Sequence, residues 1–73
     1  MDKQEAEWLM RLIRRESEKW IEAVAVEYNQ DTQRHQILCH DPKRGVYQWI
    51  ETPRQWAKLK YQRRGPQNMV AAL

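Results

Sequence analysis

The chain has 73 residues, of which 41% are hydrophobic and 32% charged, and its formal net charge is +3. A chain of this length forms one domain and buries only about 60% of its unfolded surface, so its core must be thin. The hydrophobic share argues against disorder, and no apolar run approaches the roughly 20 residues that span a bilayer. Asp2 and Glu5 argue against a signal peptide, and we expect no membrane partner.

Cysteine and histidine are scarce in this chain. Cys39 is the single cysteine, which excludes an internal disulfide and favours a reducing compartment. We therefore expect an intracellular protein, nuclear if its source is eukaryotic. His35 and His40 are the two histidines, too few to build a zinc site with one cysteine. The sequence predicts no metal and no other cofactor.

The N-terminal segment fits two structures. Asp2 begins a stretch that resembles a helix-starting capping box, and the apolar residues within Leu9–Ile13 have helical spacing. The run over residues 8–14 could equally form a strand. We favour the strand, with residues 1–7 as a short helical or disordered lead-in.

Two strands and a turn are predicted next. Residues 20–28 are rich in aromatic and β-branched side chains and show one face with a period of two. That face consists of Trp20, Val24, Val26 and Tyr28. Residues 29–33 are turn formers whose short side chains bond their own backbone, and residues 35–40 predict the following strand. His35 and His40 would lie on opposite faces of that strand, which argues against a shared site.

The strongest turn signal is Asp41–Gly45, because Pro42 fixes φ early and Gly45 permits a positive φ late. Residues 46–50 predict a further strand. Thr52 and Pro53 then predict the N-cap and first residue of a helical turn.

Residues 58–61 alternate between polar and apolar side chains and predict a short fifth strand. The segment 63–66 breaks regular structure, so we expect a flexible tail over residues 63–73. Short strands with turn signals about every ten residues indicate an all-β sheet or barrel over residues 8–62. A continuous helix over residues 4–26 would instead indicate an α+β interaction domain.

The order of these features resembles the Tudor-like (Royal) family. The pattern is a strand from Trp20 to Tyr28, a polar turn, a strand, the Asp41–Gly45 turn and a strand that carries Trp49. The resemblance covers roughly residues 8–56 and is shared by other SH3-like barrels. It implies a five-stranded Tudor/SH3-like barrel, often nuclear.

The resemblance also implies a function, which is recognition of a methylated lysine or arginine in a histone-type peptide. A methylated ammonium binds aromatic faces by cation–π attraction. By this resemblance, Trp20 and Tyr47 are cage residues and Asp41 is the acid beside the cage, although Trp20 could equally pack in the core. Tyr28 is a further candidate for peptide contact, because an exposed tyrosine can keep its hydroxyl in water. The chain departs from the family pattern at Cys39, where an aromatic residue is common.

A second hypothesis is binding of DNA or RNA through the basic C-terminal half. Phosphate-binding candidates are Lys43, Arg44, Lys58, Lys60, Arg63 and Arg64. Clustered cations attract phosphate backbones, and Tyr47 and Tyr61 would stack on bases between them. A third hypothesis is a small protein–protein interaction subunit whose exposed aromatic residues dock a partner.

The remaining conspicuous residues have structural interpretations. We expect Trp49 to pack in the core, Trp56 to cap one end of the barrel, and Cys39 to be a small buried hydrophobic residue. The sequence has no glycine-rich phosphate loop, no serine nucleophile motif and no credible carboxylate pair. We therefore predict a non-enzymatic module with no small-molecule substrate.

Overall fold

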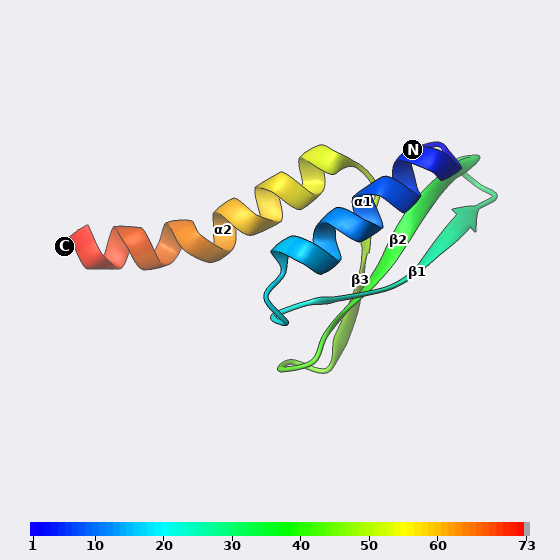
Figure 1. The fold of residues 1–73 in the computed structure, drawn as a ribbon. Coiled ribbons are helices and arrows are strands. Elements are labelled where there is room, and N and C mark those ends of the chain that lie inside the picture. The colour runs from blue at the N-terminus through cyan, green and yellow to red at the C-terminus, as the bar shows by residue number, and fades with distance from the viewer. Residues whose placement is uncertain (73) are drawn as a thin grey trace.

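The structure is a computed structural model that describes the backbone of residues 1–72 and the side chains of residues 1–62. Its elements, in chain order, are α1 (Lys3–Glu16), β1 (Glu22–Asn29), β2 (Arg34–Asp41), β3 (Val46–Ile50) and α2 (Pro53–Ala72) (Figure 1). The strands form one antiparallel sheet in the order β1-β2-β3. The fold is thus mixed α and β, and the prediction of an all-β, five-stranded barrel is wrong.

Helix α1 begins where the sequence places a cap. Asp2 has extended backbone, and its Oδ1 accepts a hydrogen bond of 2.7 Å from the backbone N–H of Glu5. This bond satisfies one of the four N–H groups that a helix leaves unpaired at its start. Arg14 and Arg15 occupy the last turn, where positive charge complements the helix dipole.

The predicted strand over residues 8–14 is wrong because the helical period decides which side chains are buried. Ala6, Leu9 and Ile13 recur every three or four residues and are all fully buried against the sheet. A strand would place Leu9 and Ile13 on one face, but Ala6 on the other. Only the helix buries all three together.

A bulge in β1 changes the predicted face of that strand. Ala23 pairs with Cys39 and Val26 pairs with Ile37, and the register shifts between Ala23 and Ala25. Ala23 and Val26 therefore both face the core although they are three residues apart, because β1 contains one extra residue between them. As a result Ala23 is buried while Val24 is 45% exposed, so the predicted alternation through Val24 is wrong.

The two turns between strands form as the sequence predicts. In the first turn, Asn29 Oδ1 accepts hydrogen bonds from the backbone N–H groups of Asp31 and Thr32, at 2.9 and 3.3 Å. In the second turn, Asp41 plays the same role, and Gly45 has φ +70°, a conformation that glycine adopts without strain. Both strands that follow are confirmed, within one residue at each end.

Helix α2 also begins as predicted and then continues further. Thr52 Oγ1 accepts a 3.0 Å hydrogen bond from the backbone N–H of Gln55, and Pro53 is the first helical residue. The helix runs to Ala72, so the predicted fifth strand over residues 58–61 is wrong. It also passes through the segment 63–66, where the sequence predicts an end to regular structure. Neither helix in the described part of the chain is long and apolar enough to cross a membrane.

The core lies on one face of the sheet, beneath α1 (Figure 1). Its largest fully buried side chains are Leu9, Ile13, Ile37, Cys39, Ile50 and Trp56. Trp56 is only 1% exposed, and its ring stacks on Trp20 at a centroid distance of 5.5 Å. The first turn of α2 therefore completes the core, whereas the opposite face of the sheet has no helix over it among the described residues.

Candidate functional site

The uncovered face of the sheet, called the open face below, is defined by the pairing register. Residues directly opposite each other in an antiparallel pair lie on the same face, and neighbours along a strand alternate between faces. Ile37 and Cys39 point into the core, so the residues between and beside them point the other way. The open face consists of Glu22, Ala25, Glu27, Gln36, Leu38, His40, Tyr47 and Trp49, of which Gln36 is buried at the end away from the basic turn.

Two large aromatic side chains dominate the part of the open face that β3 contributes. Tyr47 is 63% exposed and Trp49 is 40% exposed. The prediction that Trp49 packs in the core is wrong, because its neighbour Ile50 occupies the inward position and is fully buried. The side-chain alternation of a strand then directs Trp49 outward.

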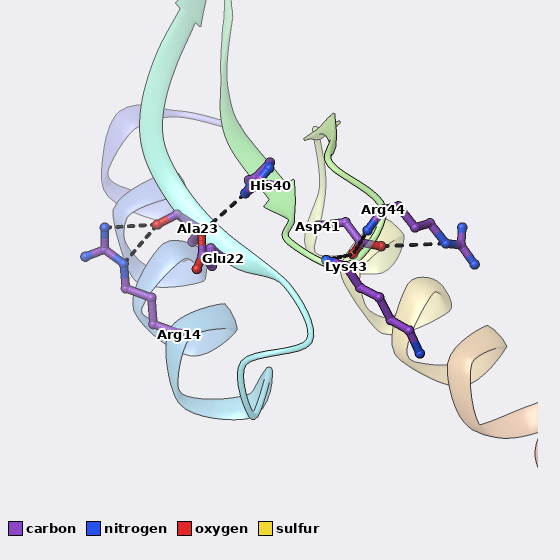
Figure 2. Close-up of polar contacts among 7 residues, drawn as sticks. All are labelled: Arg14, Glu22, Ala23, His40, Asp41, Lys43 and Arg44. Atoms are coloured by element: carbon purple, nitrogen blue, oxygen red, sulfur yellow. Dashed lines mark hydrogen bonds and ion pairs between the residues drawn. The ribbon is translucent and has the colours of Figure 1, made fainter.

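A row of contacting side chains, Glu22, His40 and Tyr47, crosses the open face from β1 to β3. The rings of His40 and Tyr47 lie 4.6 Å apart with a tilt of 37°. On its other side, His40 Nδ1 lies 3.4 Å from Glu22 Oε2 (Figure 2). Glu22 is thereby engaged within the sheet, and its charge lies on the opposite edge strand from Tyr47.

The end of β3 that carries Trp49 is anchored to α2. Gln55 Nε2 donates a 2.9 Å hydrogen bond to the carbonyl oxygen of Trp49. The backbone N–H of Glu51 in turn donates to Gln55 Oε1 at 2.8 Å. This reciprocal contact holds the backbone around Trp49 without using its side chain.

The turn Asp41–Gly45, called the basic turn below, adjoins the other end of β3. Asp41 Oδ1 accepts hydrogen bonds from the backbone N–H groups of Lys43 and Arg44, at 3.0 and 3.2 Å. Its Oδ2 lies 3.8 Å from Arg44 Nε, although the Arg44 side chain remains 80% exposed. Figure 2 shows both cationic side chains extending outward from the turn. Asp41 thus orders the turn while Lys43 and Arg44 present their charges to solvent.

A hollow of about 560 Å³ lies between the α1–β1 loop and the basic turn. Its lining residues are Glu18, Lys19, Trp20, Asp41, Pro42, Lys43 and Arg44. We call it the loop–turn hollow. It joins segments that are more than twenty residues apart in the sequence and contains more cationic than anionic side chains.

The four predicted peptide-binding residues do not lie on one surface. Trp20 and Asp41 both line the loop–turn hollow. Tyr47 lies on the open face, whereas Tyr28 belongs to the helix-covered side, where its ring contacts His35 at 5.1 Å. His35 and His40 therefore lie on opposite faces of β2, as predicted.

The predicted phosphate-binding residues are also divided. Lys43 and Arg44 lie on the basic turn, and Lys58 is exposed on α2. Lys60 is engaged, since its Nζ donates a 2.7 Å hydrogen bond to Glu16 Oε1 and lies 5.6 Å from the Trp56 ring centre. The side chains of Arg63 and Arg64 lie outside the described residues.

Glu16 connects the two helices. Besides Lys60, it accepts a 2.9 Å hydrogen bond from Trp56 Nε1. The hydrogen bond from Lys60, followed by the one from Trp56, holds the pKa of Glu16 below its usual value. The contact stabilises the docking of α2 on α1 and removes Lys60 from the cations available to a ligand.

Cys39 is a buried core residue, as the sequence predicts. Its side chain is fully buried, and burial raises the pKa of its thiol to about 11. A thiol with such a pKa stays protonated near neutral pH and is a poor nucleophile. Among the described residues, no group of three or more histidine, cysteine or acidic side chains could hold a metal ion.

Sequence reasoning missed the pairing of Tyr47 with Trp49 as one exposed surface. The signal was present, because residues 46–50 place the two aromatic residues on one face and Val46, Gln48 and Ile50 on the other. Composition alone does not indicate which of these faces is covered.

Comparison of the chain with protein-family models, with characterised proteins and with solved structures gave no significant match.

Proposed function

We propose that this protein is a non-catalytic module that binds single-stranded nucleic acid along β3. In this proposal Tyr47 and Trp49 stack on bases, and Lys43 and Arg44 contact phosphates. Leu38, which pairs with Trp49, supplies an apolar floor beside the stacked base. The observation that carries the proposal is a pair of exposed aromatic side chains directly beside an exposed basic turn.

The spacing of the aromatic pair suits successive bases. Tyr47 and Trp49 are two residues apart on one face of a strand, which separates them by about 6.6 Å along the strand. Each base has a π-face, so stacking of this kind tolerates any sequence. The sheet holds the backbone of both residues in place before binding, and the ring of Tyr47 also contacts His40, which reduces the entropy lost on association.

The distribution of charge favours a polyanion over a methylated lysine. Lys43 and Arg44 precede β3 directly, and the net charge of the chain is +3. The open-face acids, Glu22 and Glu27, lie on β1, and β2 separates β1 from β3. A cationic peptide would meet repulsion near the basic turn, whereas a phosphate backbone would meet attraction.

Fluorescence anisotropy with a labelled single-stranded oligonucleotide at low salt tests the proposal. Removing one stacked aromatic side chain costs about 1–3 kcal/mol, so Tyr47→Ala and Trp49→Ala should each weaken binding roughly 5- to 150-fold. Tyr28→Ala is the matched control, because Tyr28 is also an exposed tyrosine but lies on the helix-covered side. It should bind as the wild type does.

The salt dependence of the same assay tests the basic turn. Lys43→Ala or Arg44→Ala should reduce the slope of log affinity against log salt by about 0.7 for each lost phosphate contact. Lys3→Ala removes the same charge at the end of the molecule remote from the basic turn (Figure 1) and should leave the slope unchanged. Equal effects at Lys3 and Lys43 would contradict the proposal. So would tighter binding to a duplex or to a methylated histone-tail peptide.

A further inference from the structure

We propose that the loop–turn hollow binds the phosphate monoester of a nucleotide, either free or at the end of a strand. The inference deepens the proposed function where the nucleotide is the end of a bound strand. It is carried by three features of the hollow, which are its strained loop, its charge and its shape.

The loop on one side of the hollow has an unfavourable backbone. Glu18 and Lys19 have φ values of +51° and +73°, in the left-handed region that residues with a side chain rarely adopt. The backbone N–H of Trp20 donates a 3.0 Å hydrogen bond to the carbonyl oxygen of Ser17, which closes a turn around them. Turns with two positive φ values favour glycine, asparagine and aspartate.

Long charged side chains at both central positions of such a turn need a reason. Strained residues of this kind concentrate at sites that clamp ligands, where the strain fixes a side chain in place. Here Lys19 and Glu18 both line the hollow. The turn therefore places Lys19 at the edge of the space that it shares with the basic turn.

The balance of charge in the hollow favours an anion. Lys19, Lys43 and Arg44 line it together with two acids, Glu18 and Asp41. Asp41 accepts hydrogen bonds from two backbone N–H groups, which compensate part of its charge, and the three cations exceed the two acids by one formal charge. The cations have long side chains that can move over a bound group, and a phosphate monoester attracts them more strongly than a diester because it carries more charge.

The shape of the hollow fits a nucleotide better than a bare ion. Its volume of about 560 Å³ lies in the range of small-molecule sites. Trp20 and Pro42 add apolar surface beside the cations, which suits a sugar or a base attached to the phosphate. The hollow lies at the basic turn, so one bound strand could place its end there and its following bases on β3.

The test compares two oligonucleotides that differ only in a 5′-phosphate or 5′-hydroxyl, using the full chain. One charge-assisted contact predicts that the phosphate strengthens binding about tenfold. Lys19→Asn should bring the ratio of the two affinities close to one, because asparagine tolerates positive φ but lacks the charge. Lys3→Asn is the matched control and should keep the wild-type ratio.

A second variant reports on the strain itself. Lys19→Gly should also abolish the preference for the 5′-phosphate while raising the midpoint of thermal unfolding, because glycine adopts a positive φ without strain. The two changes together would show that the wild-type lysine is retained for binding at the expense of stability. Retention of the phosphate preference in Lys19→Gly would overturn the inference.

Titration of the labelled protein with AMP and with inorganic phosphate, followed by amide NMR shifts, separates the two proposals. AMP should shift the amides of Lys19, Lys43 and Arg44 and bind more tightly than phosphate. Equal affinity for the two would overturn the assignment to a nucleotide. An oligonucleotide that binds through Tyr47 and Trp49 without any 5′-phosphate preference, with no shifts from AMP, would overturn this inference but leave the proposed function. Binding of AMP that depends on Lys19, without any binding of the oligonucleotide, would support this inference and overturn the proposed function.

Discussion

The covered and open faces of the sheet differ in the solvent exposure of their large side chains. On the covered face Ile37, Cys39 and Ile50 are fully buried beneath α1 and the start of α2. On the open face Tyr47 and Trp49, their neighbours across and along the sheet, remain exposed. Residue size therefore does not identify the core of this domain. Isoleucine and cysteine side chains fill the covered face, and the large aromatic side chains of β3 are left available for contact with a partner.

Substitution of Trp56 and of Trp49 tests this difference, and it gives the largest expected change in the free energy of unfolding. Trp56→Ala removes a nearly fully buried ring and should lower the free energy of unfolding by about 3–5 kcal/mol. Trp49→Ala removes a partly exposed ring and should lower it by less, about 1–2 kcal/mol. Urea denaturation followed by circular dichroism measures both.

The loss of stability expected for Trp56→Ala is large enough to unfold a domain this small, since total stability is on the order of 5 kcal/mol. Trp56→Phe, which keeps most of the ring but loses the hydrogen bond to Glu16, is the milder variant. It should still destabilise the domain more than Trp49→Phe. Similar losses for the two tryptophans would contradict the assignment of the faces.

Neighbouring residues on β2 sharpen the comparison, with a smaller effect. Ile37→Ala should cost about 2–5 kcal/mol because its side chain is fully buried under α1. Leu38→Ala removes a similar volume from the open face, where the side chain is only partly buried, and should cost about 1 kcal/mol. The same urea experiment applies. A reversed order would indicate that the open face is covered in solution, for example by a second copy of the chain.

The contact between α1 and α2 gives a pH-dependent prediction, the smallest of the set. The pKa of Glu16 is lowered in the folded protein, so its contribution to stability is present above the unfolded pKa of about 4.5. That contribution is lost as the pH falls through the lower, folded pKa. The wild type should therefore lose more stability between pH 7 and pH 3 than Glu16→Gln, as measured by the urea midpoint at each pH.

Glu27→Gln is the control for this experiment, because Glu27 is an exposed acid on the open face. It should follow the wild-type pH dependence. A Glu16→Gln curve parallel to that of the wild type would show that the contacts of Glu16 with Lys60 and Trp56 do not stabilise the docking of α2.

Local signals in the sequence determined the turns and the strands between them. Asn29, Asp41 and Gly45 act within a few residues of their own positions, so their effect depends little on the rest of the chain. The caps formed by Asp2 and Thr52 are local in the same sense, and both are found where the sequence predicts them.

Tertiary structure decided the type of the first element and the length of the last. Residues 8–14 are compatible with a strand or a helix, and the helix prevails because it buries Ala6, Leu9 and Ile13 on a single face. The sequence predicts only a helical turn after Thr52. The burial of Trp56 against Trp20 and its bond to Glu16, about forty residues away, stabilise the start of a longer helix.

The sequence likewise predicted only part of the candidate site. The basic residues Lys43 and Arg44 and the exposed Tyr47 could be read directly from their turn and strand positions. The sequence by itself could not decide between Trp49 and Ile50 for the core, because alternation defines two faces without indicating which one is covered. That choice is made when α1 and the start of α2 pack against one face, since burial of apolar area is a property of the assembled fold.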